Sequence, residues 1–399
     1  MAPESSCSCS RCNVRDILGA ARLADPGDDE WGEGDDQETG IDMPGPKQPR
    51  TRAGRERVST IKQVAELAGV SIATVSRALS ESGPVSAALR RRVLAAAREL
   101  SYQPSQAARN LRVGTSKTVG VVIPDLQNPF FTGVVRGIED VLQAAGYTLL
   151  LANSDDSPPR EERALSTLRA EGVAGIVFVP ISAPTSTHHQ LLSSPIPVVA
   201  VDRSPLGLRV DLVMVDNTDG SRRAVDHLIA RGHRAIALVG GPLQHSTAVE
   251  RQQGYELALK EAGIPARADL IQYGDFREAG GYACMQALLA IPRPPTAVFV
   301  ANNLMTLGAL RAIHETGRRI PEDLAVVSFD DMPWASSINP PLTSVAQPDR
   351  EIGKTAAGLL LARIAEPDRP IRRVVLETQL VVRASCGGQL RAAQLAPPA

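Results

Sequence analysis

The chain of 399 residues lacks a hydrophobic segment that could cross a membrane. No stretch approaches the roughly 18 uninterrupted apolar residues that a transmembrane helix needs. A secretion signal needs an apolar core of about 7 to 15 residues, and Arg11, Arg15 and Asp16 interrupt the region where it would lie. We therefore expect a cytoplasmic protein without a membrane partner.

Cysteine is scarce, and its spacing predicts no disulfide framework. Three of the five cysteines are crowded between residues 7 and 12, and the other two stand alone. A tetrahedral zinc site needs a fourth ligand, and the first histidine of the chain is His188. We expect reduced thiols and no metal or other cofactor.

Motifs of common enzyme classes are also missing. No strand-like run is followed by GxGxxG, and neither HExxH nor GxSxG occurs. The segment Gly353-Lys354-Thr355 resembles the end of a phosphate-binding loop, but Pro348 stands where that loop needs its earlier glycine. We expect that the chain is not an enzyme.

Charge is distributed unevenly, although the formal net charge is only −1. Residues 25–42 contain nine acidic residues and no basic one, and residues 1–57 show no sustained hydrophobic period, which predicts a disordered acidic leader. Translation from Met43 is an alternative. Residues 58–117 contain nine basic and three acidic residues. Such a segment suits nucleic acid, although a solvated helix face would carry Arg90 to Arg92 equally well.

Short runs of Val, Ile and Leu alternate with amphipathic segments from residue 118 to about 385. Examples of the runs are TVGVVIP at 118–124, GIVFVP at 175–180 and AIALVG at 235–240. Continuous apolar runs suit strands that helices cover on both faces. The pattern predicts an α/β sensor of two lobes with doubly wound parallel sheets, and ligands in such folds bind at the carboxyl ends of the strands.

Residues 60–79, TIKQVAELAGVSIATVSRAL, have the spacing of a helix-turn-helix. Thr60 and Ser71 can cap two helices, and Gly69 permits a sharp turn between them. Val75 and Leu79 lie one turn apart on the inner face of the second helix. Its other residues are short and uncharged apart from one arginine, which suits entry into a major groove: Ile72, Ala73, Thr74, Ser76 and Arg77.

A third helix is predicted after Ser86, because apolar residues recur from Leu89 to Leu100 at helical spacing. It would complete an all-α head at 58–102. Residues 103–117 are basic and only weakly apolar, which predicts a linker with latent helical propensity.

With VSAALRRRVLAAARELSYQPS, AARNL and VGVVIPDLQNPFF, these segments resemble the LacI/GalR family of bacterial transcription regulators over residues 58–385. The resemblance implies a helix-turn-helix DNA-binding head, a hinge at 103–117 that becomes helical on DNA, and a sensor similar to periplasmic sugar-binding proteins. It further implies a homodimer on a near-palindromic double-stranded operator. The expected lobes are 118–215 with 347–373, and 216–346 with 374–385, followed by a tail at 386–399.

The resemblance also assigns roles in DNA binding. Ile72, Ala73 and Arg77 would face base edges, and Leu111 would enter the minor groove beside Arg112. Leu111 could instead pack the linker against the sensor. The full set of expected DNA contacts is Thr60, Ser71, Ile72, Ala73, Thr74, Ser76, Arg77, Ser80, Ser86, Leu111 and Arg112.

By position, the family's effector site would lie in the sensor. Arg251 resembles the arginine that holds the effector in the family, with Asn302 and Asp330 as its partners. Its alternative role is a structural salt bridge. An arginine that converges with an amide and a carboxylate suits a polyol. The family usually has Asn-Asp at 302 and 303, whereas this chain has Asn302-Asn303. The expected effector contacts are Phe131, His245, Thr247, Arg251, Phe276, Asn302 and Asp330.

The resemblance favours a repressor whose affinity for its operator is controlled by a small effector, a sugar. One alternative is a regulator that binds DNA better with a purine or nucleoside. A sugar-binding transport protein would share the sensor fold, but it would have no use for a basic head.

Overall fold

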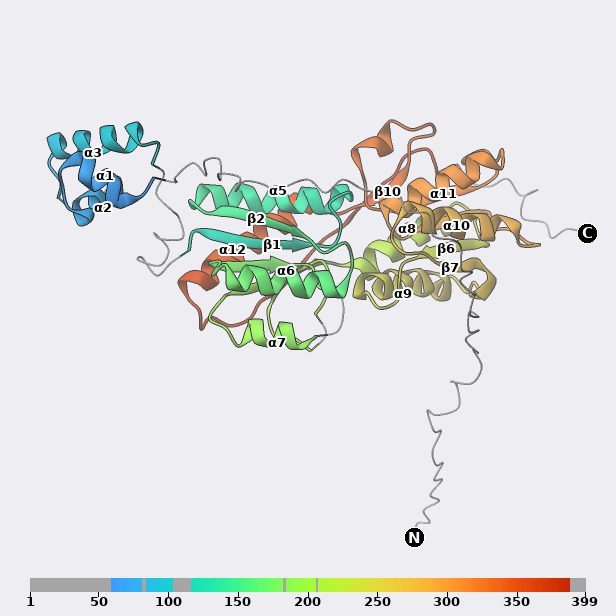
Figure 1. The fold of residues 1–399 in the computed structure, drawn as a ribbon. Coiled ribbons are helices and arrows are strands. Elements are labelled where there is room, and N and C mark those ends of the chain that lie inside the picture. Colours follow the sequence, from blue (N-terminus) through green and yellow to red (C-terminus); the bar gives the residue numbers. More distant parts are fainter. Residues whose placement is uncertain (1–58, 81–83, 103–115, 182–183, 206, 388–399) are drawn as a thin grey trace, which may run out of the picture. The chain divides into compact units, whose positions relative to one another are not determined.

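The computed structural model describes residues 59–80, 84–102, 116–181, 184–205 and 207–387. They fall into two units that divide between Tyr102 and Gln103. We call the described part of the first unit the head and that of the second the sensor (Figure 1).

The head is a bundle of three helices around a small core. Its helices are α1 (Ile61–Ala68), α2 (Ile72–Ser80) and α3 (Ala87–Glu99). Small and β-branched side chains let the helices approach closely. The fully or nearly fully buried members of the core are Val64, Ala65, Ala68, Val75, Ala78, Val93, Ala96 and Ala97.

Polar caps start the three helices where the sequence places them. Thr60 forms a capping box with Gln63 at α1, and Ser86 accepts from the backbone of Leu89 at α3. At α2, Ser71 Oγ accepts from the N–H of Thr74 at 3.2 Å. Gly69 takes a left-handed conformation with φ of 60°, which a side chain would strain, and so ends α1.

Arg92 of α3 holds this turn in place. Its Nε donates to the carbonyl oxygen of Ala68 at 3.1 Å, and its Nη2 donates to that of Gly69 at 3.3 Å. The guanidinium thereby satisfies carbonyls that the end of α1 leaves open. This arginine of the basic run stabilises the head.

Lobe 1 of the sensor has a parallel six-stranded sheet in the order β11-β5-β4-β3-β1-β2. Its strands are β1 (Thr118–Ile123), β2 (Thr148–Asn153), β3 (Gly175–Phe178), β4 (Val198–Val201), β5 (Asp211–Val215) and β11 (Arg373–Leu376). Its helices are α5 (Pro129–Ala144), α6 (Pro158–Ala170), α7 (Ser186–Leu192) and α12 (Asp349–Ala365). Helices α5 and α12 pack side by side on one face of the sheet, and α6 and α7 cover the other face; Figure 1 shows α5 and α6 on opposite sides of β1.

Lobe 2 repeats this architecture with the strand order β12-β10-β9-β8-β6-β7, in which β12 alone runs antiparallel to its neighbour. Its strands are β6 (Ile236–Gly240), β7 (Ile271–Tyr273), β8 (Ala297–Val300), β9 (Ala325–Phe329), β10 (Thr343–Ala346) and β12 (Gln379–Val381). Its helices are α8 (Asn217–Ala230), α9 (Ser246–Glu261), α10 (Glu278–Ala290) and α11 (Asn303–Glu315), with the 3-10 turns η1 (Ala268–Leu270) and η2 (Pro333–Ser336).

The central strands of each sheet are buried on both faces, as the apolar runs predict, whereas the edge strands β2, β11, β7 and β12 are partly exposed. In lobe 1, Val121 and Val177 face one core and Val122 and Phe178 face the other. In lobe 2 the alternate residues of β6 divide in the same way between two cores. The expected fold class, an all-α head and an α/β sensor of two parallel-sheet lobes, is confirmed.

Two expected boundaries move. Strand β11 pairs with β5 in lobe 1 as far as Leu376, so the chain enters lobe 2 for the last time after this residue rather than after Arg373. Cys386 is fully buried in the lobe 2 core, whereas the tail was expected to begin there. In the first case β11 forms the edge of the lobe 1 sheet, and in the second the small side chain of Cys386 fits among the buried residues of lobe 2.

Among the residues described, no helix is both long and apolar enough to pass through a bilayer.

Candidate effector cleft and DNA-binding head

One face of α2 exposes the side chains expected to read DNA. Ile72 is 48% exposed, and Ala73 and Arg77 are exposed beside it. Arg77 Nε donates to the carbonyl oxygen of Ala73 at 3.3 Å, so the arginine lies along its own helix. The capping residues Thr60, Ser71 and Ser86 are exposed, and Thr74 is half-buried.

Ser76 differs from the expectation that it faces outward. It is 8% exposed and borders the core between Val75 and the buried Ala78. At about 100° per residue, position 76 falls on the edge of the inner face rather than beside Arg77. The side chain of Ser80, and all of Leu111 and Arg112, lie outside the described residues.

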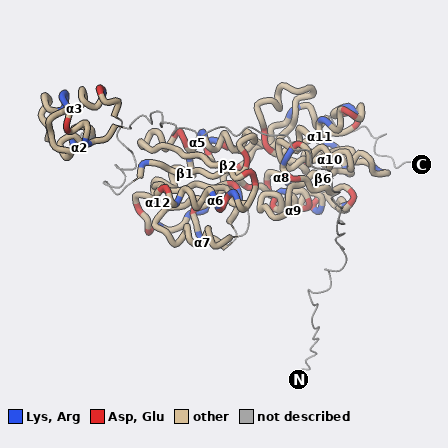
Figure 2. Tube along the Cα trace, in the orientation of Figure 1, with Lys and Arg blue, Asp and Glu red and all other residues tan. Residues whose placement is uncertain are grey.

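Basic residues outnumber acidic residues in the described part of the head. Figure 2 shows Lys and Arg on α2 and α3, and α3 contributes Arg90, Arg91, Arg92 and Arg98. Arg92 is committed to the turn after α1, whereas Arg91 and Arg98 are exposed. The head therefore carries positive charge that a phosphate backbone can use.

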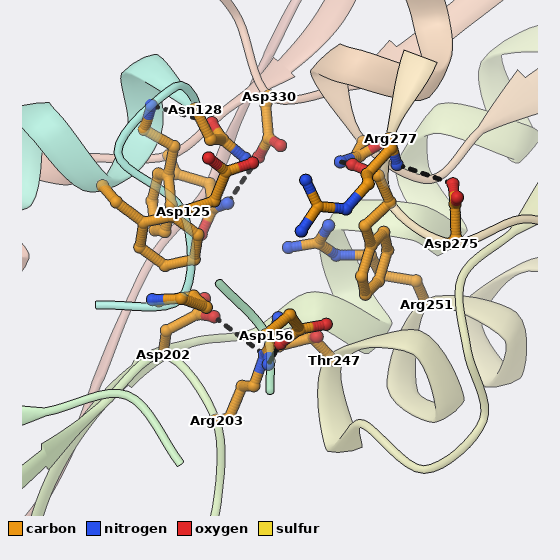
Figure 3. Close-up of a pocket in the computed structure, with 16 residues that line it drawn as sticks. Asp125, Asn128, Asp156, Asp202, Arg203, Thr247, Arg251, Asp275, Arg277 and Asp330 are labelled. Carbon is orange, nitrogen blue, oxygen red and sulfur yellow. Dashed lines mark hydrogen bonds and ion pairs between the residues drawn. The ribbon is translucent and has the colours of Figure 1, made fainter. Parts of the chain in front are cut away.

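A narrow cleft lies between the lobes (Figure 3). Its lining comes mainly from the carboxyl ends of strands and the helix starts that follow them, where α/β folds bind ligands. It is lined by Pro124, Asp125, Asn128, Phe130, Phe131, Asp156, Asp202, Arg203, Thr247, Arg251, Asp275, Phe276, Arg277, Asn302, Asp330 and Gln347.

Arg251 on α9 lies at the centre of the cleft and is 4% exposed. Its Nε donates to Asn217 Oδ1 at 2.9 Å and its Nη1 to the carbonyl oxygen of Ala301 at 2.6 Å, while the guanidinium lies 3.8 Å above the ring of Phe329. Burial lowers the pKa of Arg251, and the charges of Asp330 and Asp202 oppose this shift. Among the described residues the short contacts of Arg251 go to a neutral amide and a backbone carbonyl, and no carboxylate lies within 4.0 Å of it.

Asn302 and Asp330 flank this arginine in lobe 2. Asn302 caps α11 through Met305 and donates to the carbonyl oxygen of Phe276 at 2.9 Å. Asp330 follows β9 with φ of 72°, and its Oδ1 accepts from Gln347 Nε2 at 2.5 Å. Asp330 Oδ2 also accepts from the N–H of Asn303 at 3.4 Å, so the protein holds both side chains at two atoms each and fixes their orientation.

Aromatic rings form two sides of the cleft. Phe131 begins α5 in lobe 1, and Phe276 follows β7 in lobe 2. A Cβ atom at Gly241 would lie 2.2 Å from the ring of Phe276, so only glycine there allows the ring its place. The two rings offer flat apolar faces to a ligand.

His245 was expected to contact the effector, but it does not line the cleft. Its ring is buried and stacks on Phe276 at a centroid distance of 6.0 Å, and its Nε2 lies 3.0 Å from Asp156 Oδ2. His245 is two residues before Thr247, which does line the cleft. At the start of α9, however, the imidazole lies against Phe276 and not in the cleft. His245 instead packs against Phe276, which forms part of the wall of the cleft.

Several lining residues were missed by sequence reasoning. Asp125, Asp202 and Asp275 each come within two residues of the end of a strand, at the sheet edge where ligands bind. Their position just after the end of a strand is the sequence signal that could have identified them. The other missed residues are Pro124, Asn128, Phe130, Asp156, Arg203, Arg277 and Gln347.

Polar contacts join the two lobes around the cleft. Arg277 Nη2 donates to Asp155 Oδ1 at 2.9 Å, and the backbone N–H of Ser204 donates to Ser246 Oγ at 2.9 Å. Asp156 joins lobe 1 to His245 of lobe 2 and also accepts from Arg203 at 2.7 Å. Burial alone would raise the pKa of Asp156, but His245 and Arg203 hold it well below its usual value.

Comparisons with known proteins identify the chain. Residues 60–105 match the lacI family of bacterial regulatory proteins, and residues 225–386 match a periplasmic binding protein-like domain. Over 330 residues the chain is 34% identical to the HTH-type transcriptional repressor PurR of Histophilus somni, covering 82% of this chain and 99% of the relative. The chain belongs to the lacI family.

Other members of the lacI family agree with this assignment. The ribose operon repressor of Escherichia coli is 36% identical over 329 residues, which cover 82% of this chain and all of the relative. The transcriptional regulator CelR in complex with cellobiose is 38% identical with a TM-score of 0.63 over 82% of this chain and 99% of that structure.

The lac repressor dimer bound to operator and the anti-inducer ONPF is 30% identical with a TM-score of 0.74, over 83% of this chain and all of that structure. These lacI-family relatives are transcriptional regulators rather than enzymes. The chain is a DNA-binding transcriptional repressor with an effector-controlled sensor.

Proposed function

We propose that this lacI-family repressor acts in the cytoplasm as a homodimer on a near-palindromic operator, and that a sugar in the cleft controls its affinity for DNA. The carrying observation is that one chain has an exposed, short-side-chain helix face around Arg77 and a cleft in which Arg251, Asn302 and Asp330 converge. A sugar transport protein would not need the first of these.

On DNA, the exposed face of α2 would enter the major groove. Arg77 can donate to guanine O6 and N7, while Ile72 and Ala73 would make apolar contacts with base edges. Thr60, Ser71, Thr74 and Ser86 would position the head on phosphates without reading sequence. Ser76, being buried, is left out of this proposed interface, and Leu111 with Arg112 stays assigned to the minor groove.

In the cleft, a sugar would meet donors and acceptors at once. Each hydroxyl group is both a donor and an acceptor, so it suits a place where arginine, amide and carboxylate groups alternate. Arg251, Asn302 and Asp330 supply these three groups, and Phe131 and Phe276 can lie against the faces of the sugar ring. The names of the relatives support ribose as the first sugar to test.

A purine is the second candidate, because the PurR relatives are similar over nearly their full length. A purine base could stack on Phe131 or Phe276. Its few N–H groups give the carboxylates of the cleft fewer donors than the several hydroxyl groups of a sugar do, which favours a sugar.

Control would work through closure of the lobes, because the effector contacts both of them. A ligand that binds one arrangement of the lobes better shifts the population toward it. A thousandfold change in affinity for the operator would need about 4 kcal/mol of coupling.

The test measures binding of the full chain to genomic fragments by gel shift at several salt concentrations, with and without ribose, other sugars and purines. A preferred fragment, steep weakening with salt and a change in affinity on adding a sugar are expected. Absence of any preferred fragment at moderate salt would contradict the proposal. An effect of purines but no sugar would move the assignment to the second candidate.

A further inference from the structure

The lining of the cleft has an excess of negative charge. Five aspartates and three arginines contribute to it. Figure 2 shows acidic residues gathered between β2 and α8, where the lobes meet. The balance matters for ligand choice because charges that are removed from bulk water interact strongly.

Two of the three guanidinium groups already have carboxylate partners. Arg203 Nη1 lies 2.7 Å from Asp156 Oδ1, and Arg277 Nη2 lies 2.9 Å from Asp155 Oδ1. An anionic ligand would have to compete with these aspartates for the same donors. The two arginines therefore offer little free positive charge.

The third guanidinium group, that of Arg251, is held by neutral acceptors and an aromatic ring. Its charge faces Asp202 and Asp330, which are both more than nine-tenths buried. Arg203, which is also buried, is shared between Asp156 at 2.7 Å and Asp202 at 3.8 Å, so Arg203 and Arg251 together stand against three carboxylates, those of Asp156, Asp202 and Asp330. In Figure 3 the side chains of Arg251 and Arg277 reach into the cleft from lobe 2, and Asp125 and Asp202 reach in from lobe 1.

Asp202 is short of donors. It is 6% exposed, its side chain makes no hydrogen bond among the described residues, and its nearest cation is Arg203 Nε at 3.8 Å. Burial raises the pKa of this carboxyl group, with Arg203 and Arg251 opposing the shift. A buried carboxylate without hydrogen bonds is unfavourable, and a ligand hydroxyl that donates to it would remove this cost.

We propose that the cleft selects neutral polyols and rejects anionic sugar derivatives, so that the repressor responds to a free sugar and not to its phosphate ester. This inference rests on the proposed function. A phosphate group would bring about −1.5 to −2 charges to a site in which aspartates already engage two of the three arginines and negative charge is already in excess. Hydroxyl groups bring the donors that Asp202 and Asp330 can use.

Isothermal titration calorimetry on the full chain tests the proposal with matched pairs: ribose and ribose 5-phosphate, glucose and glucose 6-phosphate, galactose and galactose 6-phosphate. The neutral member of at least one pair should bind, and its phosphate ester should bind at least 100-fold more weakly. A phosphate ester that binds as well as its parent sugar overturns the charge selection and leaves the sugar-responsive repressor standing. Failure of every compound to bind overturns the charge selection and the sugar assignment on which it rests, whereas the gel shift with operator fragments tests the repressor role separately.

Asp202→Asn separates charge from shape, because asparagine has nearly the same volume. It should weaken binding of the free sugar about tenfold and also narrow the ratio between the two dissociation constants, since one repelling charge is gone. Asp140→Asn, on the exposed side of α5, removes the same charge outside the cleft and should leave both constants unchanged. A ratio in Asp202→Asn equal to that of the unmodified chain, in a variant with unchanged thermal stability, would contradict the role of Asp202.

Discussion

The side-chain amide of Asn303 donates to the side-chain oxygen of Asn128 over 2.8 Å and thereby joins lobe 2 to lobe 1. Both residues are buried. The same oxygen of Asn128 accepts from the N–H of Phe130 and caps α5. Because this oxygen is already an acceptor, the partner from lobe 2 must be a donor, which asparagine provides and aspartate does not.

Asn303→Asp should therefore weaken the junction between the lobes. Either the new carboxylate faces the oxygen of Asn128, or Asn128 turns its amide toward it and leaves α5 without its cap. We expect the sensor to lose about 1 to 2 kcal/mol of unfolding free energy and the effector to bind about tenfold more weakly. Urea unfolding and calorimetric titration measure the two effects.

Gln143→Glu is the matched control, because it adds the same charge to the exposed side of α5. It should change neither quantity. Unchanged stability and unchanged effector affinity in Asn303→Asp would show that the contact between the lobes is dispensable.

Sequence reasoning predicted the elements well but not every side-chain direction. Apolar runs predicted the central strands because a strand that is buried on both faces consists almost entirely of apolar residues. Ser76 was placed correctly in its helix, but the helix period puts it at the edge of the inner face rather than outward. His245 was expected to face the effector, but it stands directly before α9 and its ring stacks on Phe276, a contact between distant segments that the sequence alone does not show. Asp202 was missed because its role arises from what lobe 2 brings opposite it.

Arg77→Ala should reduce discrimination between operator and random DNA. Loss of a bidentate contact to guanine costs about 1 to 3 kcal/mol on the operator only. Fluorescence anisotropy against the preferred fragment and a scrambled duplex measures the ratio of affinities. Arg98→Ala is the control: it removes one exposed positive charge from α3 and should leave the ratio of the two affinities unchanged. Equal losses on both duplexes in Arg77→Ala would assign the arginine to phosphates instead.

Arg92→Ala should damage the fold of the head rather than its specificity. The variant loses the hydrogen bonds to Ala68 and Gly69, which we expect to cost the head about 1.5 to 3 kcal/mol. Hydrogen exchange of α1 and α2 should become faster, whereas Arg91→Ala on the exposed side of α3 should leave it unchanged. Normal protection of both helices in Arg92→Ala would show that Gly69 holds the turn without help.

The stability of the sensor should fall in mild acid because of His233. Burial lowers the pKa of this histidine to about 4 from an ordinary value of 6.5, and its Nδ1 lies 3.0 Å from Thr296 Oγ1. The unfolded chain takes up a proton below pH 6.5, while the folded chain resists until about pH 4. The contribution of His233 is thus complete above pH 6.5 and decreases by roughly 2 to 3 kcal/mol as the pH falls to 4.

His233→Asn removes this titration and keeps a side chain that can bond to Thr296. Urea unfolding at pH 7 and at pH 4.5 should show that the variant loses less stability between the two conditions than the unmodified chain does, whatever its stability at pH 7. His189→Asn removes an imidazole from the surface of α7 and controls for the loss of a histidine as such. Parallel pH profiles for His233→Asn and the unmodified chain would mean that His233 titrates alike in both states, and the acid sensitivity would then have to come from carboxylates such as Asp156.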